Sequence, residues 1–148
     1  MSRIAVNGVR LNVAVSGQGP ALLLLHGFSG SGKTWTGHVE HWRTHTCIAV
    51  DLLGHGASDC PAGPERYRMD RCVEDLTALL DELGVGRTAV LGYSMGGRVA
   101  LHLALAAPER LSALVLESAS PGIDDMGERE RRIASDAALA GRIEREGV

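Results

Sequence analysis

"TAVLGYSMGGRVALHLALA", residues 88–106, joins two elements of different type through a single serine. Residues 88–91 form a short β-prone run, whereas residues 95–107 are rich in alanine and leucine and stop before a proline, as helices do. The connection, Gly92-Tyr93-Ser94-Met95-Gly96, matches the pattern G-x-S-x-G. The residues two before and two after the serine approach neighbouring backbone in such a turn, and glycine fits there. The pattern predicts a strained turn that exposes the Ser94 hydroxyl.

Outward from this turn, the chain alternates between apolar strands and helices. Residues 4–15 alternate in polarity around Asn7-Gly8 and predict a β-hairpin. Further strands are predicted at residues 22–25, 47–51 and 111–118, and helices at residues 35–42 and 69–83. Because strands and helices alternate after the hairpin, we expect an α/β fold with a mostly parallel sheet and right-handed crossovers.

The composition of the chain changes at residue 124. Residues 1–123 carry the strand–helix pattern, and residues 124–148 are charged, helical and sparsely apolar. A helix with few apolar positions has no wide face to bury against a sheet. We therefore assign residues 1–123 to the core of the domain and expect residues 124–148 to begin a layer outside the sheet.

Composition excludes several classes of protein. The 148 residues are 45% hydrophobic, which suits one globular unit, and the net charge of -3 with 3% aromatic residues argues against nucleic acid or an anionic membrane as a partner. No apolar run reaches 18 residues and the first residues do not read as a signal peptide, so we expect a cytoplasmic location. The three cysteines form no C-x-x-C pair, and we expect neither a metal site nor a cofactor.

A second motif points to a different chemistry. In "LLLLHGFSGSGKTW", residues 22–35, the segment 27–34 matches the phosphate-binding pattern G-x-x-x-x-G-K-[ST], and Lys33 is the only lysine of the chain. Asp51 follows the next strand, as a metal-binding aspartate does in nucleotide-binding proteins. However, only sixteen residues separate Thr34 from Asp51, which leaves room for one short helix and one strand. Nucleotide binding therefore stays a distant alternative.

The serine turn suggests another role for the glycine-rich loop. Where a serine is the nucleophile in such a turn, one N–H that binds the developing oxyanion belongs to the residue after it, here Met95. The other comes from a loop after an earlier strand that often begins with His-Gly, as His26-Gly27 does here. We expect the Phe28 N–H to be this second donor.

The hairpin, "LHGFSG", "DLLGHGASD" and "LGYSMGGRVAL" occur in the order and at the spacing of the α/β-hydrolases, which the chain resembles. Together, "HGFSGSGKTW", "GYSMGGR" and "LESASPGIDDMGERERRIASD" narrow the resemblance to the 2-succinyl-6-hydroxy-2,4-cyclohexadiene-1-carboxylate synthases of menaquinone biosynthesis. The resemblance implies an α/β-hydrolase-type sheet and a helical lid that begins at residue 124. It also implies a lyase that eliminates pyruvate from a succinyl-cyclohexene carboxylate.

The same resemblance assigns roles to residues of this chain. Ser94 would remove a ring proton, and the N–H groups of Phe28 and Met95 would hold the enolate-like oxyanion. Such a substrate carries several carboxylates, which arginine binds well. Arg98 and Arg132 match substrate-binding arginines of the family, and Tyr93 would shape the pocket.

The residues alone also allow simpler interpretations. Arg98 could be an ordinary exposed helix residue, and Arg132 could pair with Glu128 on a solvated helix. A serine esterase or a C–C bond hydrolase of the same fold would use the same serine and oxyanion donors. A neutral ester, however, would not need the arginines, and this favours the lyase. The oligomeric state stays open.

The remaining members of a Ser-Asp-His triad are missing from the pattern. In this fold they follow the serine on loops after later strands, and Asp124, Asp125 and Asp136 come too early to be the triad acid. We expect His26 to shape the oxyanion loop and His55 to belong to a structural loop. The chain thus reads as the N-terminal part of an enzyme that ends inside the lid, and we expect it to be nearly inactive alone.

Overall fold

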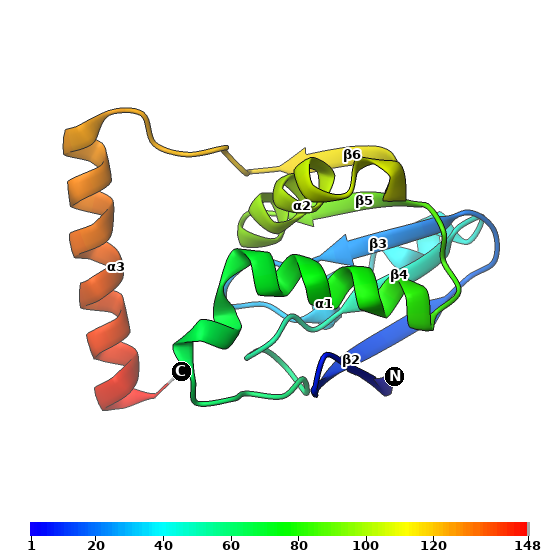
Figure 1. The fold of residues 1–148 in the computed structure, drawn as a ribbon, viewed down its shortest axis with the longest axis horizontal. Coiled ribbons are helices and arrows are strands. Elements are labelled where there is room, and N and C mark those ends of the chain that lie inside the picture. Colours follow the sequence, from blue (N-terminus) through cyan, green and yellow to red (C-terminus); the bar gives the residue numbers. More distant parts are fainter. Residues whose placement is uncertain (148) are drawn as a thin grey trace.

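Six strands form one mixed sheet in the computed structural model, which describes residues 1–147. The order across the sheet is β1-β2-β4-β3-β5-β6, with antiparallel pairing of β1 to β2 and β2 to β4 and parallel pairing elsewhere (Figure 1). The strands are β1 Ser2–Val6, β2 Val9–Ser16, β3 Ala21–Leu25, β4 Thr46–Val50, β5 Thr88–Tyr93 and β6 Leu111–Glu117. The α-helices are α1 Met69–Glu82, α2 Met95–Ala106 and α3 Met126–Glu146. This arrangement confirms the predicted α/β fold with its N-terminal hairpin.

The hairpin turn uses the residues that the sequence singles out. Asn7 and Gly8 have φ angles of 46° and 82°, so both central positions of the turn are left-handed. Asparagine and glycine tolerate this conformation best, and the resulting twist matches that of the flanking strands. Val6 therefore lies opposite Val9, and the hairpin adds two antiparallel strands at one edge of the sheet.

Both faces of the central strands are buried. Leu23 and Leu25 of β3 belong to the main hydrophobic core, to which α1 and α2 contribute, and Leu22 and Leu24 belong to a smaller core around Trp35. Successive residues of a strand point to opposite faces, so a continuous leucine run suits a strand covered on both sides. This double cover explains why β3, and β4 after Thr46, are apolar.

The predicted helix at residues 35–42 is wrong in type. Two short 3₁₀-helices stand there instead, at Gly32–Trp35 and Val39–Trp42. Thr36 and Gly37 between them are weak helix formers, and the burial of Trp35 fixes the segment against the sheet. Two more 3₁₀-helices occupy Pro64–Tyr67 and Pro108–Arg110.

The helix α1 ends as its sequence predicts. Gly84 adopts a φ of 67°, and its N–H donates to the Asp81 carbonyl at 2.9 Å. The next N–H, of Val85, donates to the Leu80 carbonyl at 2.8 Å. These two hydrogen bonds form a Schellman motif, which satisfies carbonyls of the last helical turn. The motif needs a residue in the left-handed conformation, and Gly84 supplies it.

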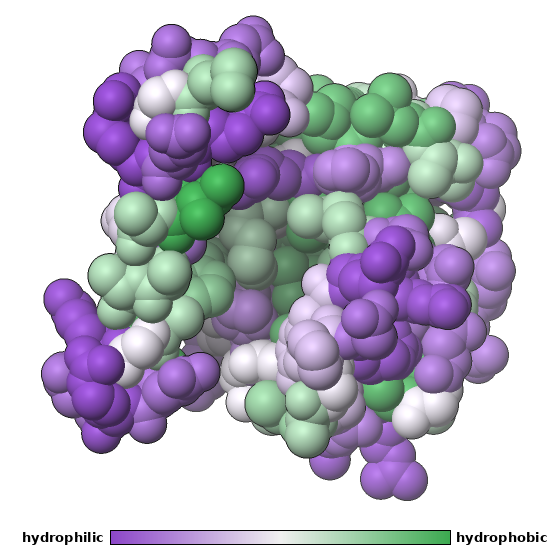
Figure 2. Space-filling view, turned by 60° about the vertical axis from the view of Figure 1, so that its left-hand side comes forward, coloured by the Kyte–Doolittle hydropathy of each residue, from purple (hydrophilic) through white to green (hydrophobic). Residues whose placement is uncertain are grey.

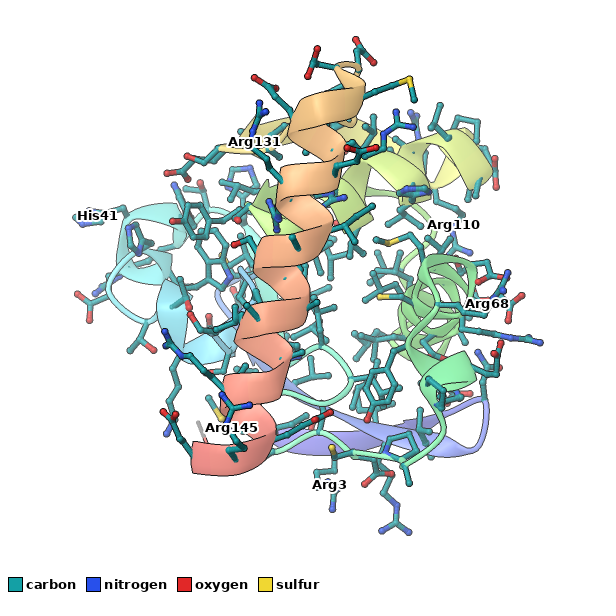
Figure 3. All side chains as sticks on the ribbon, turned by 90° about the vertical axis from the view of Figure 1, so that its left-hand side faces the viewer. Arg3, His41, Arg68, Arg110, Arg131 and Arg145 are labelled. Carbon is teal, nitrogen blue, oxygen red and sulfur yellow. The ribbon has the colours of Figure 1, made fainter. Side chains whose placement is uncertain are left out.

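Helix α3 stands outside the sheet. Figure 1 shows it beyond the carboxyl ends of the parallel strands, joined to β6 by residues 118–125. The view from that side shows α3 crossing in front of the other elements, with Arg131 in its first half and Arg145 near its end (Figure 3). Most of its residues are exposed, as a sparsely apolar helix requires. Among residues 1–147, no helix has the length and hydropathy needed to cross a membrane.

Candidate active site

Ser94 occupies the turn between β5 and α2. The strand ends at Tyr93, the helix begins at Met95, and Ser94 itself has φ 52° and ψ -112°. Positive φ costs a non-glycine residue on the order of 1–3 kcal/mol and persists where the surroundings hold it. The Ser94 N–H donates to the Glu117 carbonyl of β6 at 2.8 Å, which helps to hold the turn. The hydroxyl is thus presented at the carboxyl end of the sheet.

The two glycines that flank Ser94 have no room for a side chain. A Cβ on Gly92 would lie 2.6 Å from the carbonyl carbon of Gly96, and a Cβ on Gly96 would lie 2.5 Å from the carbonyl carbon of Leu25. These distances are shorter than real Cβ contacts, and the obstacle in both cases is backbone. The close approach therefore explains G-x-S-x-G in the way that the sequence predicts.

A cavity of about 640 Å³ lies between Ser94 and α3. Figure 2 shows this side of the molecule hollowed beside α3, with hydrophobic residues in the depth of the hollow. Its lining comprises Phe28, Ser94, Met95, Arg98, Ser118, Ala119 and Ser120 from the body, and Arg132, Asp136, Leu139, Ala140, Ile143 and Glu144 from α3. Five of the six predicted site residues meet in this one cavity.

Tyr93 is the predicted site residue that does not line the cavity. Its ring lies against Gly27, where an added Cβ would be 3.1 Å from two ring carbons. Ser118 and Ser120 also line the cavity, although they are not among the predicted site residues. A signal existed, because the carboxyl ends of parallel strands meet at one edge of a sheet, and both residues follow β6.

The N–H groups of Phe28 and Met95 are free to bind a ligand. Within residues 1–147, neither donates a hydrogen bond to another group of the protein. Both residues line the cavity beside Ser94. Two unpaired backbone donors next to one hydroxyl are suited to an oxygen that gains negative charge.

The charges around the cavity are mixed. Arg132 Nε lies 2.8 Å and 2.9 Å from the two carboxylate oxygens of Asp136, so the suggested pairing with Glu128 is wrong. Both spacings place partners on one helix face, and the structure selects the residue at i+4. Arg98 is exposed and has no ion-pair partner among residues 1–147. It is therefore the unpaired cation of the cavity within that range, and Glu144 is a second acidic residue of the lining.

The glycine-rich loop is not arranged to hold a phosphate. The N–H of Gly30 donates to the Gly27 carbonyl and that of Thr34 to the Ser31 carbonyl, both at 2.9 Å. The N–H of Gly32 donates to Asp51 at 2.6 Å. A phosphate loop needs such N–H groups to be free. The geometry therefore opposes the nucleotide-binding alternative.

Asp51 is buried and fully engaged by the protein. One carboxylate oxygen accepts from Gly32, and the other accepts from Asn12 Nδ2 at 2.9 Å and from the Ala57 N–H at 2.8 Å. Burial by itself raises the pKa of Asp51, but the hydrogen bonds from Ala57, Asn12 and Gly32 outweigh it and lower the pKa. These donors occupy the lone pairs that a metal would need. Within the described part of the chain, no group of three or more His, Cys, Asp or Glu residues could hold a metal ion.

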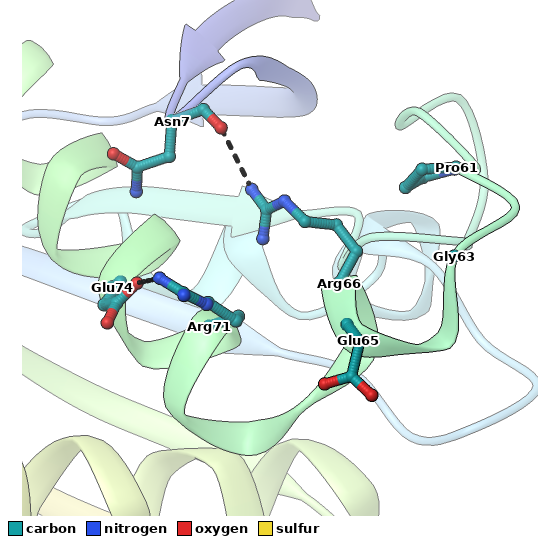
Figure 4. Close-up of a pocket in the computed structure, with 7 residues that line it drawn as sticks. All are labelled: Asn7, Pro61, Gly63, Glu65, Arg66, Arg71 and Glu74. Atoms are coloured by element: carbon teal, nitrogen blue, oxygen red, sulfur yellow. Dashed lines mark hydrogen bonds and ion pairs between the residues drawn. The ribbon is translucent and has the colours of Figure 1, made fainter.

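A second hollow, of about 370 Å³, lies beside the hairpin turn (Figure 4). Both of its arginines are already paired. Arg66 donates to the Asn7 carbonyl at 3.3 Å and to Asp75 at 2.8 Å, and Arg71 pairs with Glu74 at 2.7 Å. Neither arginine of this hollow is therefore free to bind a ligand, whereas Arg98 of the cavity at Ser94 is unpaired among residues 1–147, so that cavity is the better candidate.

Comparison with known proteins defines the class. The model of the family described as the alpha/beta hydrolase fold matches residues 20–135. The chain therefore belongs to the α/β-hydrolase fold family. It is 44% identical, over 96% of its length, to a protein of Bacillus subtilis (strain 168) provisionally named 2-succinyl-6-hydroxy-2,4-cyclohexadiene-1-carboxylate synthase.

Epoxide hydrolases are also similar to the chain. Epoxide hydrolase 3 of Siraitia grosvenorii is 37% identical over 76% of the chain. A crystal structure of an epoxide hydrolase from Vigna radiata matches 78% of the chain with a TM-score of 0.75 and 33% identity. The chain spans about half of the Bacillus subtilis relative, 53% of its length, and just over a third of each epoxide hydrolase, 36% and 37%.

Proposed function

We propose that this chain carries the active-site serine of a carbon–oxygen lyase that eliminates pyruvate from a succinyl-cyclohexene carboxylate of menaquinone biosynthesis. The observation that carries the proposal is that Ser94, the unpaired Arg98, and Phe28 and Met95 with their free N–H groups line one cavity. The 44% identity to the Bacillus subtilis relative, over almost the whole chain, supports this choice among the reactions of the family.

In the proposed reaction, the Ser94 oxygen removes a proton from the ring. The electrons of that C–H bond form a ring double bond, and the C–O bond to the three-carbon substituent breaks. The leaving group departs as enolpyruvate and becomes pyruvate by tautomerisation. No water is consumed, so the substrate equals the sum of the two products.

Negative charge builds on a substrate oxygen conjugated with the carbon that loses its proton. The N–H groups of Phe28 and Met95 are proposed to bind this oxygen. A pair of preorganised donors lowers the barrier because the charge is larger in the transition state than in the ground state. The N-terminus of α2, which begins at Met95, adds a favourable partial positive charge.

Arg98 and Arg132 are proposed to bind substrate carboxylates. Arg98 lies one helical turn after Ser94 and is unpaired within residues 1–147. Arg132 would exchange Asp136 for a substrate carboxylate. Both partners of that pair are more than half exposed, and exposed pairs contribute roughly 0–1 kcal/mol, so the exchange costs little.

A serine oxygen needs a base to accept its proton. Within residues 1–147, no histidine lines the cavity. We propose that the base and its carboxylate partner belong to the part of the domain that the longer relatives possess, and that α3 begins the lid over the site. Consequently, the chain alone should be nearly inactive.

The similarity to epoxide hydrolases keeps a hydrolytic enzyme as the alternative. The two functions differ in their need for Arg98, because a neutral ester has no carboxylate to bind. The test protein is a hybrid in which this chain continues into the C-terminal part of the Bacillus subtilis relative. Pyruvate release and hydrolysis of p-nitrophenyl acetate are measured in the hybrid and in its Arg98→Met variant.

For the lyase, Arg98→Met raises the KM for the polycarboxylate substrate at least tenfold, an effect of about 1.4 kcal/mol, and leaves ester hydrolysis unchanged. Arg131→Met is the matched control, since Arg131 is an exposed arginine of α3 that does not line the cavity. Equal KM values in both variants, or fast ester hydrolysis without pyruvate release, would contradict the proposal.

A further inference from the structure

Two histidines hold the loop that carries Phe28. His26 is fully buried, and its Nε2 accepts a hydrogen bond from the Leu52 N–H at 3.0 Å. That nitrogen therefore carries a lone pair, and the proton of the neutral ring sits on Nδ1. Nδ1 lies 2.7 Å from the Gly27 carbonyl oxygen, to which it donates. Burial lowers the pKa of His26, in keeping with the neutral ring.

His55 makes the corresponding contact one residue further along the loop. Its Nε2 lies 2.5 Å from the Phe28 carbonyl oxygen, and its Nδ1 lies 3.1 Å from the Leu53 carbonyl oxygen. A carbonyl only accepts, so the shorter contact assigns a proton to Nε2. The ring of Phe28 packs edge-on against the imidazole, with 6.1 Å between the ring centroids.

Together the two imidazoles secure both peptide groups that flank the Phe28 α-carbon. The Gly27 carbonyl shares its planar peptide with the Phe28 N–H, so holding the carbonyl also fixes the direction of the N–H. The Phe28 carbonyl belongs to the next peptide group, which His55 holds. With both planes restrained, rotation about the Phe28 α-carbon is limited, and the free N–H keeps its direction.

We propose that His55 is a positioning residue for the oxyanion donor, because its tether to the Phe28 carbonyl fixes the loop that lines the cavity together with Ser94. The inference rests on the proposed function in so far as it concerns catalysis. The restraint on the loop stands by itself. Misplaced donors lose transition-state stabilisation, and removal of a whole donor costs about 100-fold to 1,000-fold in kcat. Loosening one donor should cost less.

Two amide variants separate the contacts of His55. The amide of glutamine reaches the place of Nε2, and the shorter amide of asparagine reaches only the place of Nδ1. His55→Gln should keep the tether to Phe28, whereas His55→Asn and His55→Leu should lose it. His41→Leu is the control, because His41 is an exposed histidine away from the cavity.

The first readout is the NMR spectrum of the chain itself, which requires no turnover. We expect the carbonyl resonance of Phe28 to move upfield, and its amide signal to broaden, in His55→Asn and His55→Leu. Both should stay near their wild-type positions in His55→Gln and His41→Leu. Unchanged Phe28 resonances in His55→Leu would overturn the inference, whether or not pyruvate is released.

The second readout is steady-state kinetics of the hybrid protein. In His55→Asn and His55→Leu, loss of the tether should lower kcat about tenfold and leave KM within twofold of the wild-type value. His55→Gln, which keeps the tether, should retain most of the wild-type kcat. Equal kcat values for the Leu and Gln variants would overturn the catalytic role. If the wild-type hybrid releases no pyruvate, the proposed function fails, and the NMR comparison still decides whether His55 positions the loop.

Discussion

Ser94 combines a reactive position with an unfavourable backbone conformation. The backbone strain that its φ of 52° causes is not relieved by the neighbouring residues. Gly92 and Gly96 relieve crowding against other backbone segments, but they do not reduce the strain of the serine itself. The strain should therefore show in stability when the side chain is changed. Glycine removes it, and alanine keeps it.

We expect Ser94→Gly to be more stable than Ser94→Ala by roughly 0.5–1 kcal/mol, the relief of left-handed strain less the entropy cost of glycine. Urea unfolding of both variants measures the difference. At Ser16, which pairs regularly with Cys47 in the sheet as part of strand β2, the order should reverse, because glycine weakens an ordinary strand. The same order at both positions would mean that Ser94 is not strained.

His26 makes a pH-dependent contribution to stability. Its folded-state pKa is lowered from 6.5, mainly by burial, so the unfolded chain binds the proton more readily. The contribution is present above pH 6.5 and is lost as the pH falls below it. Urea unfolding between pH 7.5 and 5.5 should show a smaller loss in His26→Gln than in the wild type. Parallel curves would show that His26 does not titrate on unfolding.

At the scale of the elements, Asp51 ties three segments together. It accepts from Asn12 on β2, from Gly32 at the first 3₁₀-helix and from Ala57 in the following loop. Asp51→Asn replaces one carboxylate oxygen by an NH₂ group. This group can only donate, so it cannot accept from the N–H groups that it faces. We expect a loss of roughly 2–4 kcal/mol in the free energy of unfolding.

The matched control is Asp81→Asn, since Asp81 is exposed and its pair with Arg110 is worth at most about 1 kcal/mol. Because the folded pKa of Asp51 is lowered, the wild type should also lose stability as the pH falls below about 3.8, and the Asn variant should lose less. Similar losses of stability in Asp51→Asn and Asp81→Asn would contradict this role.

The sequence predicts those turns and helix ends whose conformation depends on residues within the same segment. Asn7-Gly8 predicts its turn and Gly84 predicts the end of α1, because each depends on a left-handed residue in its own segment. The Ser94 turn is predictable for the same reason. The helix at residues 35–42 was predicted wrongly, since its apolar spacing fits a helix while Thr36 and Gly37 do not sustain one.

The parts of the site that could not be predicted depend on contacts between segments. Nothing in the sequence decides whether Arg132 pairs with Glu128 or Asp136, since both spacings suit a helix. The direction of Tyr93 follows from its packing on Gly27. The tether of His55 to Phe28 joins residues 27 positions apart.

At the scale of the whole molecule, β6 is an edge strand that exposes apolar side chains to solvent. Leu114, Val115 and Leu116 are each more than a third exposed, and an open edge strand invites pairing with another chain. We expect the chain to self-associate in a concentration-dependent way. Val115→Lys should reduce this association in sedimentation experiments, whereas an exposed lysine placed at Leu105 of α2 should not. Equal association of both variants would contradict an interface at β6.

Ser94 and its cavity are proposed to belong to a pyruvate-eliminating lyase. The most direct test is pyruvate release from the succinyl-cyclohexene carboxylate by the hybrid protein, by its Ser94→Ala variant and by the chain alone. We expect turnover by the hybrid, a loss of several orders of magnitude in Ser94→Ala, and almost no release by the chain alone. Pyruvate release that survives Ser94→Ala, or a folded hybrid that releases none, would contradict it.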